Sequence, residues 1–238
     1  MVDFDADVRK LQQSLIIKPL AGAVLLAPAD TAIPEKFTTG AAATLQALTG
    51  FKSVGHISKE NSPTFTPETE TSDVESWGLL EAARTDIISR NTTITWTGQE
   101  THKLNLELYH NVDLTNVKGD KDSGELGFAD PTAPALRYHR AIFISVDGAG
   151  ADQIYIIKVV PKFVVTEVSE QAGTRSRRSS TPSLAAAKVD ETLGYAVKTI
   201  FAGPAGRRSS PRPLRTGNPL GPLLPAVTHC PAAAHSSG

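Results

Sequence analysis

The chain has 238 residues, of which 40% are hydrophobic and 21% charged, so it can bury a core as one large domain or two small ones. No stretch approaches the roughly twenty apolar residues of a membrane-spanning helix, and the acidic start MVDFDADVRK differs from a signal peptide. The single cysteine, Cys230, excludes an intramolecular disulfide and a cysteine-cluster metal site. We therefore expect a soluble protein of a reducing compartment that is held together by packing.

The formal net charge of −1 hides an asymmetry along the chain. All 25 acidic residues but only 20 of the 24 basic ones precede Arg207, which gives residues 1–206 a net charge of −5. Residues 207–238 contain no aromatic residue and six of the 16 prolines, a composition that does not support a packed core. We predict one folded domain over residues 1–206 and a disordered Pro-, Arg- and Ala-rich tail over residues 207–238. The acidic balance argues against a surface that grips DNA, because phosphate binding needs clustered Lys and Arg.

Most predicted elements are strands. Segments rich in Val, Ile and aromatic residues predict strands at residues 14–18, 23–27, 91–97, 138–146, 153–168 and 193–201, and the turn residues DGAGAD join the fourth and fifth into a hairpin. Residues 153–168 are apolar at both parities, so we expect this strand to be covered on both faces. Pro161 lacks an amide proton and predicts a bend, a bulge or an edge there. Residues 34–50 and the basic, serine-rich residues 173–182 are expected to be loops.

One α-helix is predicted at about residues 73–85. Ser72 and Glu75 have the spacing of a capping box. At roughly 100° per residue, an apolar stripe forms on one side of this helix, made of Trp77, Leu79, Leu80, Ala83 and Ile87. Arg84 falls within the stripe, where its guanidinium needs a carboxylate or carbonyl partner in the same subunit or across an interface. The alternative is an arginine that extends along the edge of the core with its charge in water.

No motif for catalysis or for ligand binding has the correct spacing. The six histidines lack the short spacings of a metal site, and no nucleophile elbow or phosphate-binding loop is present. Residues 120–125, DKDSGE, differ from a calcium loop because the glycine is at the fifth position and Pro131 at the twelfth. We therefore expect no catalytic residue, no cofactor and no bound metal.

Several segments, taken in their order, resemble the major tail proteins, or tail tube proteins, of long-tailed bacteriophages, especially those of actinobacteria. They are GHISKENSPTFTPETETSDVESWGLLEAARTDII at residues 55–88, TITWTGQETHKLNLELYH at 93–110, KFVVTEVSEQ at 162–171 and KVDETLGYAVKTIFAGP at 188–204. The corresponding positions include Gly55, Trp77, Gly78, Arg84 and residues 99–109. The resemblance covers most of residues 14–206; residues 172–183 replace an alternating strand of the family, and residues 207–238 extend past its usual end.

The resemblance implies a β-sandwich or barrel-like core with one flanking helix and long loops. It also implies hexameric rings that stack into the tail tube of the virion, assemble in the cytoplasm of the bacterial host, and let DNA pass without specific binding. The implied partners are other copies of the chain and the tape measure, tail terminator and distal tail proteins, with no membrane partner. Trp77, Leu80 and Arg84 become the candidate subunit interface.

Two other classes of function remain open from the sequence. A monomeric β-sandwich binding or adhesin module, of a virion or a cell surface, would share the strands but needs an exposed ligand patch. A small hydrolase on a β scaffold would use Ser, His and Asp residues that the fold brings together.

Overall fold

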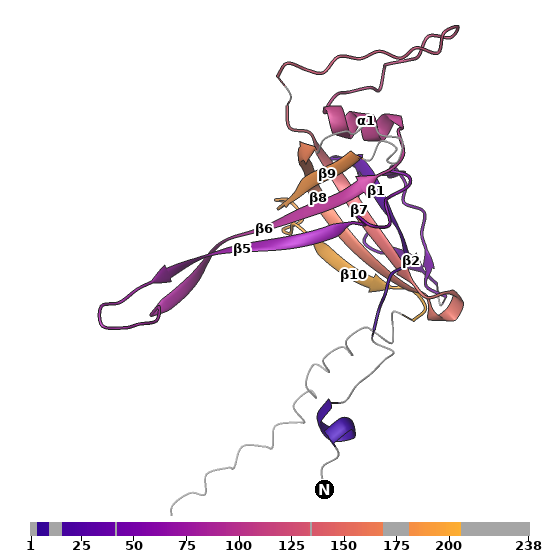
Figure 1. Ribbon diagram of the computed structural model, residues 1–238. Coiled ribbons are helices and arrows are strands. Elements are labelled where there is room, and N and C mark those ends of the chain that lie inside the picture. Colours follow the sequence, from indigo (N-terminus) through magenta and orange to yellow (C-terminus); the bar gives the residue numbers. More distant parts are fainter. Residues whose placement is uncertain (1–3, 10–15, 41, 134, 169–180, 206–238) are drawn as a thin grey trace, which may run out of the picture.

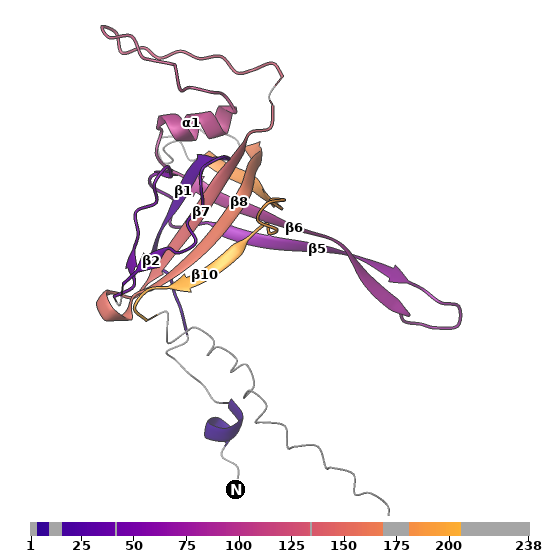
Figure 2. The ribbon, with the colours of Figure 1, turned by 180° about the vertical axis from the view of Figure 1, so that it is seen from behind.

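The computed structural model describes residues 4–9, 16–40, 42–133, 135–168 and 181–205. Its main feature is one antiparallel sheet with the strand order β4-β1-β7-β8-β9-β6-β5, in which β10 also pairs with β8 (Figures 1 and 2). The strands are β1 (Ala21–Pro28), β4 (Lys52–Ser53), β5 (Thr64–Val74), β6 (Arg84–Gly98), β7 (Tyr138–Asp147), β8 (Ile154–Val168), β9 (Thr181–Lys188) and β10 (Lys198–Ala202). A small second sheet pairs β2 (Thr38–Thr39) with β3 (Thr44–Leu45).

The mainly β fold class is confirmed, and it has a β-sandwich-like character. The helical elements of the described residues are α1 (Lys103–His110), a π-helical turn η1 (Phe4–Arg9) and a 3-10 turn η3 (Gly150–Asp152). α1 places Leu104 and Leu108, four residues apart, against the core, and Asn111 ends it in the left-handed conformation with φ 51°. In Figure 1, α1 flanks one end of the sheet.

The position predicted for the helix, residues 73–85, is wrong. Val74 ends β5 and Arg84 begins β6, and the connecting residues contain a turn at Trp77 and Gly78. Ser72, the expected helix cap, lies in β5 opposite Asp86 of β6. The β-branched residues on both sides of the turn favour paired strands, and Gly78 has φ 88°, which a right-handed helix cannot contain.

The sheet is buried on both faces around β8, as its apolar residues at both parities predicted. One face holds Val160 and Phe163 of β8 in a core with Phe143 and Trp96. The opposite face is a second core that contains Ile157 of β8 with Ile142 and Phe37. Phe37 comes from residues 34–50, which form a loop, as predicted, apart from the short β2 and β3. This loop covers the second face of the sheet.

Pro161 lies where β8 changes partners. Residues 155–159 of β8 pair with β10, whereas residues 162–168 pair with β9. The ladder between β8 and β7 shifts its register between His139 and Ala141, opposite Pro161. The irregularity expected at this proline is therefore confirmed as a register shift, which accommodates the missing amide proton.

The other strand predictions have mixed outcomes. The predicted strands at residues 23–27 and 91–97 lie within β1 and β6, and the predicted hairpin is β7 and β8. Residues 16–18 are not a strand, and β10 begins only at Lys198. Residues 173–180 of the predicted loop lie outside the described residues, and its last two residues, Thr181 and Pro182, belong to β9. The predicted tail over residues 207–238 also lies outside the described residues.

Candidate subunit interface

β5 and β6 continue beyond the rest of the sheet as a two-stranded arm, which we define as residues 66–91 (Figures 1 and 2). All residues from 66 to 88 are exposed. The two strands pair with each other along the whole arm, and β9 pairs with β6 only from Thr92 to Gly98. The arm therefore depends on its own ladder and contacts little else in the subunit.

The base of the arm is anchored in the first core. The ring of Phe65 packs edge-on against Phe143, with the ring centroids 4.9 Å apart, and Ile94 beside it in the register is fully buried. The Lys158 ammonium lies 3.9 Å from the Phe65 ring centroid, and burial lowers the pKa of this lysine. These contacts fix the direction in which the arm leaves the body.

The tip of the arm, residues 75–83, exposes large apolar side chains. Trp77 and Leu80 are fully exposed, and Leu79 keeps 61% of its surface accessible. The tip is nevertheless ordered by backbone hydrogen bonds from Leu79 to Ser76 at 3.1 Å and from Ala83 to Val74 at 2.9 Å. An exposed apolar group on an ordered projection is typical of a site that binds another macromolecule.

Arg84 lies at the start of β6 and not within a buried apolar stripe. Its guanidinium contacts the Asp86 carboxylate, with Nη2 to Oδ1 at 2.8 Å and Nε to Oδ1 at 2.9 Å. The expected carboxylate partner is thus in the same subunit, and both side chains are at least half exposed. Trp77 and Leu80 therefore lie in the tip, and Arg84 follows it at the start of β6, instead of all three sharing one helix face.

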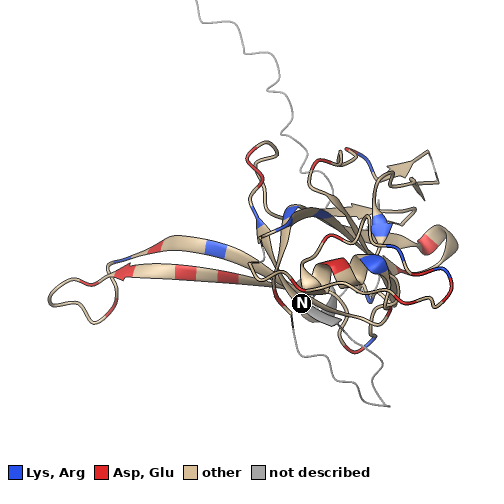
Figure 3. Ribbon diagram, turned by 90° about the horizontal axis from the view of Figure 1, so that it is seen from above, with Lys and Arg blue, Asp and Glu red and all other residues tan. Residues whose placement is uncertain are grey.

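The arm is strongly acidic. Its charged residues are six acids and two bases (Glu68, Glu70, Asp73, Glu75, Glu81, Asp86, Arg84 and Arg90). Figure 3 shows several acidic residues along β5, whereas the β6 strand of the arm carries one acid and two basic residues. Because like charges repel, this pattern keeps unassembled arms apart despite their apolar tips and favours a binding surface that carries positive charge.

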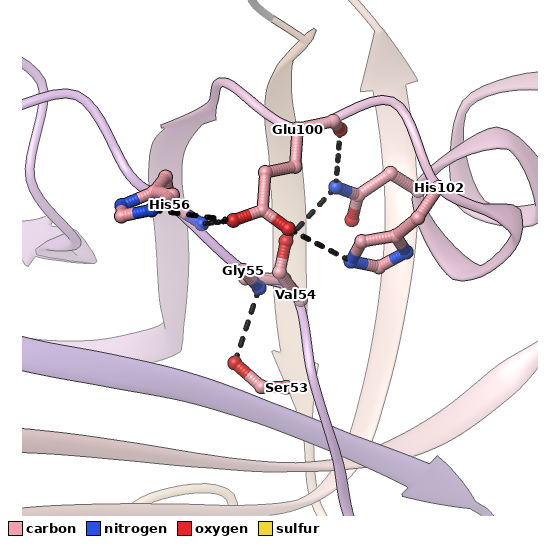
Figure 4. Close-up of polar contacts among 7 residues, drawn as sticks. Ser53, Val54, Gly55, His56, Glu100 and His102 are labelled. Atoms are coloured by element: carbon pink, nitrogen blue, oxygen red, sulfur yellow. Dashed lines mark hydrogen bonds and ion pairs between the residues drawn. The ribbon is translucent and has the colours of Figure 1, made fainter.

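A polar cluster that the sequence did not reveal surrounds Glu100 (Figure 4). The Glu100 carboxylate accepts a hydrogen bond from the His56 backbone amide at 2.8 Å and lies 4.0 Å from His102 Nε2. The buried Asn105 amide donates to the Val54 carbonyl at 2.9 Å and to the Glu100 carbonyl at 2.7 Å. The cluster ties residues 53–56 to the start of α1, so its role is structural. The described residues contain no group of three or more His, Cys, Asp or Glu that could hold a metal ion.

A second contact group holds the long connection between α1 and β7. His110 Nδ1 lies 2.7 Å from Asp130 Oδ1, and the Asn111 side chain donates to the Ala135 carbonyl at 2.7 Å. Between α1, residues 130–139 and the end of β8 lies a cavity of about 450 Å³, which we call the α1 cavity. His139 lines it, and burial together with the nearby Arg137 charge lowers the pKa of this histidine.

Residues 10–182 match the family described as phage tail tube protein. The chain belongs to the phage tail tube protein family. A comparison with curated proteins gave no match. Family membership makes this tail tube protein a structural component of the virion tail, which assembles with copies of itself and with other tail proteins into a tube.

The family is structural, which suggests that the tail tube protein is not an enzyme. No helix in the described part of the chain is long and apolar enough to cross a membrane. The features of the tail tube protein that call for a functional explanation are therefore its surfaces, above all the exposed arm.

Proposed function

We propose that this tail tube protein polymerises as stacked hexameric rings, and that the resulting tube conducts the phage genome into the host cell. The observation that carries the proposal is the arm, which leaves its own subunit with an exposed apolar tip. A two-stranded hairpin without cover is marginally stable in water, so a neighbouring copy that covers the arm would stabilise it. Contact between two different surfaces of identical chains repeats from copy to copy and produces rings or filaments.

Trp77, Leu80 and Arg84 are the residues that we assign to the subunit interface. Tryptophan and arginine are the residue types that contribute most often to interface hot spots, and Leu80 adds apolar area beside Trp77. Arg84 is held by Asp86, so its guanidinium is oriented before assembly and could contact a carboxylate of the next subunit.

Passage of DNA without specific binding is supported by one face of the hairpin. The register places hydroxyl, amide and acidic side chains together on this face (Thr64, Thr66, Glu68, Glu70, Ser89, Asn91, Thr93 and Thr95). The face contains no Lys or Arg, and DNA binding by phosphate neutralisation requires such residues. A tube lumen lined by this face would be well hydrated and would not bind the phosphates of the moving duplex.

The proposal extends to domain organisation and partners. We assign residues 1–206 to the tube-forming domain and residues 207–238 to a tail that adds no packed core. The tape measure, tail terminator and distal tail proteins would contact the polymer along its lumen and at its two ends, with assembly in the cytoplasm of the bacterial host.

Sedimentation and negative-stain electron microscopy of the purified full chain test the function. We expect rings or tubes at high protein concentration, and we expect Trp77→Ala to reduce them. Leu126→Ala is the matched control, because Leu126 is also exposed (45%) but lies outside the arm. A chain that stays monomeric and binds a host-surface ligand would instead favour an adhesin module.

A further inference from the structure

We infer that the tip of the arm docks into the α1 cavity of the neighbouring copy. This inference rests on the proposed polymer and adds the partner surface of the arm. It joins two features that the subunit leaves unused, the exposed apolar tip and a partly apolar cavity on the body.

The α1 cavity offers the tip apolar surface and sufficient volume. Leu108, with 6% of its surface accessible, lines the cavity together with Leu136 and Val168, which remain 64% and 41% exposed. Burying Trp77 and Leu80 of another copy there would remove apolar surface of both partners from water. A volume of about 450 Å³ lies in the range of protein sites that accept groups of this size.

The α1 cavity offers the charged residues near the tip one partner of each sign. Arg137 lines the cavity, and its Nη2 atom lies 3.4 Å from Oδ2 of Asp113. Its guanidinium can therefore face the acids of the tip, Glu75 and Glu81. Glu167, an exposed acid that lines the same cavity, is a partner for the oriented Arg84.

Two acids that line the cavity already have partners within the subunit. Asp130 is bound to His110, and the Glu107 carboxylate accepts the Leu114 backbone amide at 3.1 Å. These contacts engage both carboxylates with their own subunit.

Other cavities of the described residues fit the tip less well. The one between residues 60–64 and β6 is lined by Glu60 and Glu167 and by no basic residue, so it offers no partner for the acids of the tip. The one beside β10 is lined mainly by polar and small residues, with Phe201 as an exposed ring. Because the exposed Phe201 ring gives it apolar surface, the cavity beside β10 is the main alternative docking site for the tip.

The tip reaches the α1 cavity only in another copy. In Figures 1 and 2 the arm runs away from the body, and its tip lies far from α1. Tip and cavity are also different surfaces of one chain, so each subunit both donates a tip and accepts one.

Disulfide cross-linking between two variants of the full chain tests the inference. Both variants carry Cys230→Ser; one adds Leu80→Cys at the tip and the other adds Leu136→Cys at the cavity. Both leucines are exposed, so the substitutions leave the fold intact. The matched control replaces Leu136→Cys by Phe201→Cys, an exposed position beside the rival cavity.

We expect the Leu80 and Leu136 pair to cross-link at least about tenfold faster than the control pair when the mixture polymerises, because docking raises the effective concentration of the two thiols. Polymers that cross-link through Phe201 and not through Leu136 overturn the docking inference but leave the tube intact. Failure of the parent chain to polymerise in sedimentation overturns the proposed function, and the docking inference with it.

A charge variant gives an independent readout. Leu136→Asp should reduce polymer formation as strongly as Trp77→Ala, at an unchanged melting temperature of the subunit. Undiminished polymer formation by Leu136→Asp would overturn the inference.

Discussion

Trp77 and Trp96 lie on the same hairpin, but Trp77 is fully exposed in its turn, whereas Trp96 is 4% exposed and packs 5.6 Å from the Phe163 ring. The two tryptophans of the chain thus divide the hairpin into an anchored base and a free tip. One element therefore stabilises the subunit at one end and is available for assembly at the other.

Substitution of the two tryptophans should separate stability from assembly. We expect Trp96→Ala to lower the free energy of unfolding by about 3–5 kcal/mol, because it leaves a cavity among aromatic rings. Trp77→Ala should change it by less than about 0.5 kcal/mol, since an exposed side chain loses few contacts. Urea denaturation measures both values, and sedimentation measures polymer formation. Equal destabilisation by the two variants would contradict the division of roles.

Gly55→Ala should destabilise the subunit through the Glu100 cluster. Gly55 has φ 83°, which costs an L-residue about 1–2 kcal/mol, and an added Cβ would collide with the Glu100 carboxylate that holds the His56 amide. Gly124→Ala is the control, because Gly124 has φ 71° with open space around it. We expect the larger loss for Gly55→Ala in thermal melts. Similar losses would mean that only the backbone conformation matters.

Acidification should destabilise the subunit in part through His139. Burial, and then the Arg137 charge, lower the pKa of this histidine below 6.5 in the folded state. As the pH falls below 6.5, His139 takes up a proton in the unfolded chain before it does so in the folded chain, and this favours unfolding. The stability contributed by neutral His139 is therefore present above pH 6.5 and is lost as the pH falls towards the lowered pKa. Melting temperatures between about pH 7 and pH 5 should fall less steeply for His139→Gln than for the parent chain. A slope that is unchanged in the variant would assign the loss to other groups.

Removal of the basic C-terminal segment should affect DNA binding and leave the fold intact. Residues 207–238 contribute four arginines and no acid, so a chain that ends at Gly206 should show no duplex binding near physiological ionic strength. The full chain should show only weak binding that salt abolishes. Limited proteolysis should remove the segment before it cuts the domain. Tight, salt-resistant binding by the shortened chain would contradict the proposed conduit.

Much of the sheet could be predicted because its strands carry strong local signals. β7 and β8 are long, rich in Ile and Val, and separated by turn residues, so their hairpin is readable from the sequence. Burial of β8 on both faces followed from its apolar residues at both parities. The partner change at Pro161 could be predicted only as an irregularity, because the identity of the partner strands depends on long-range packing.

The arm was mispredicted and α1 was not predicted, because their local patterns are misleading. The capping-box spacing of Ser72 and Glu75 and an apolar stripe favoured a helix, but the alternating Thr and Glu residues of β5 carried the competing period of two. Conversely, the alternating leucines of LNLEL look like a strand, although tertiary packing of Leu104 and Leu108 makes this segment α1. The α1 cavity and the Glu100 cluster join segments that are distant in the sequence, so no local pattern marks them.

β8 also has a consequence for the order of folding. Only residues 148–153 separate it from β7, and β9 and β10 follow it, whereas β1 must return to β7 across a long stretch of chain. Ladders between nearby segments form with a smaller loss of chain entropy, so we expect the β7–β8 hairpin to form early and to act as a template for the other strands. In the strand pairing, the hairpin of β5 and β6 is joined to this template through β9. The element that joins neighbouring copies would then be positioned last, so that polymerisation begins only after the core of the subunit has closed.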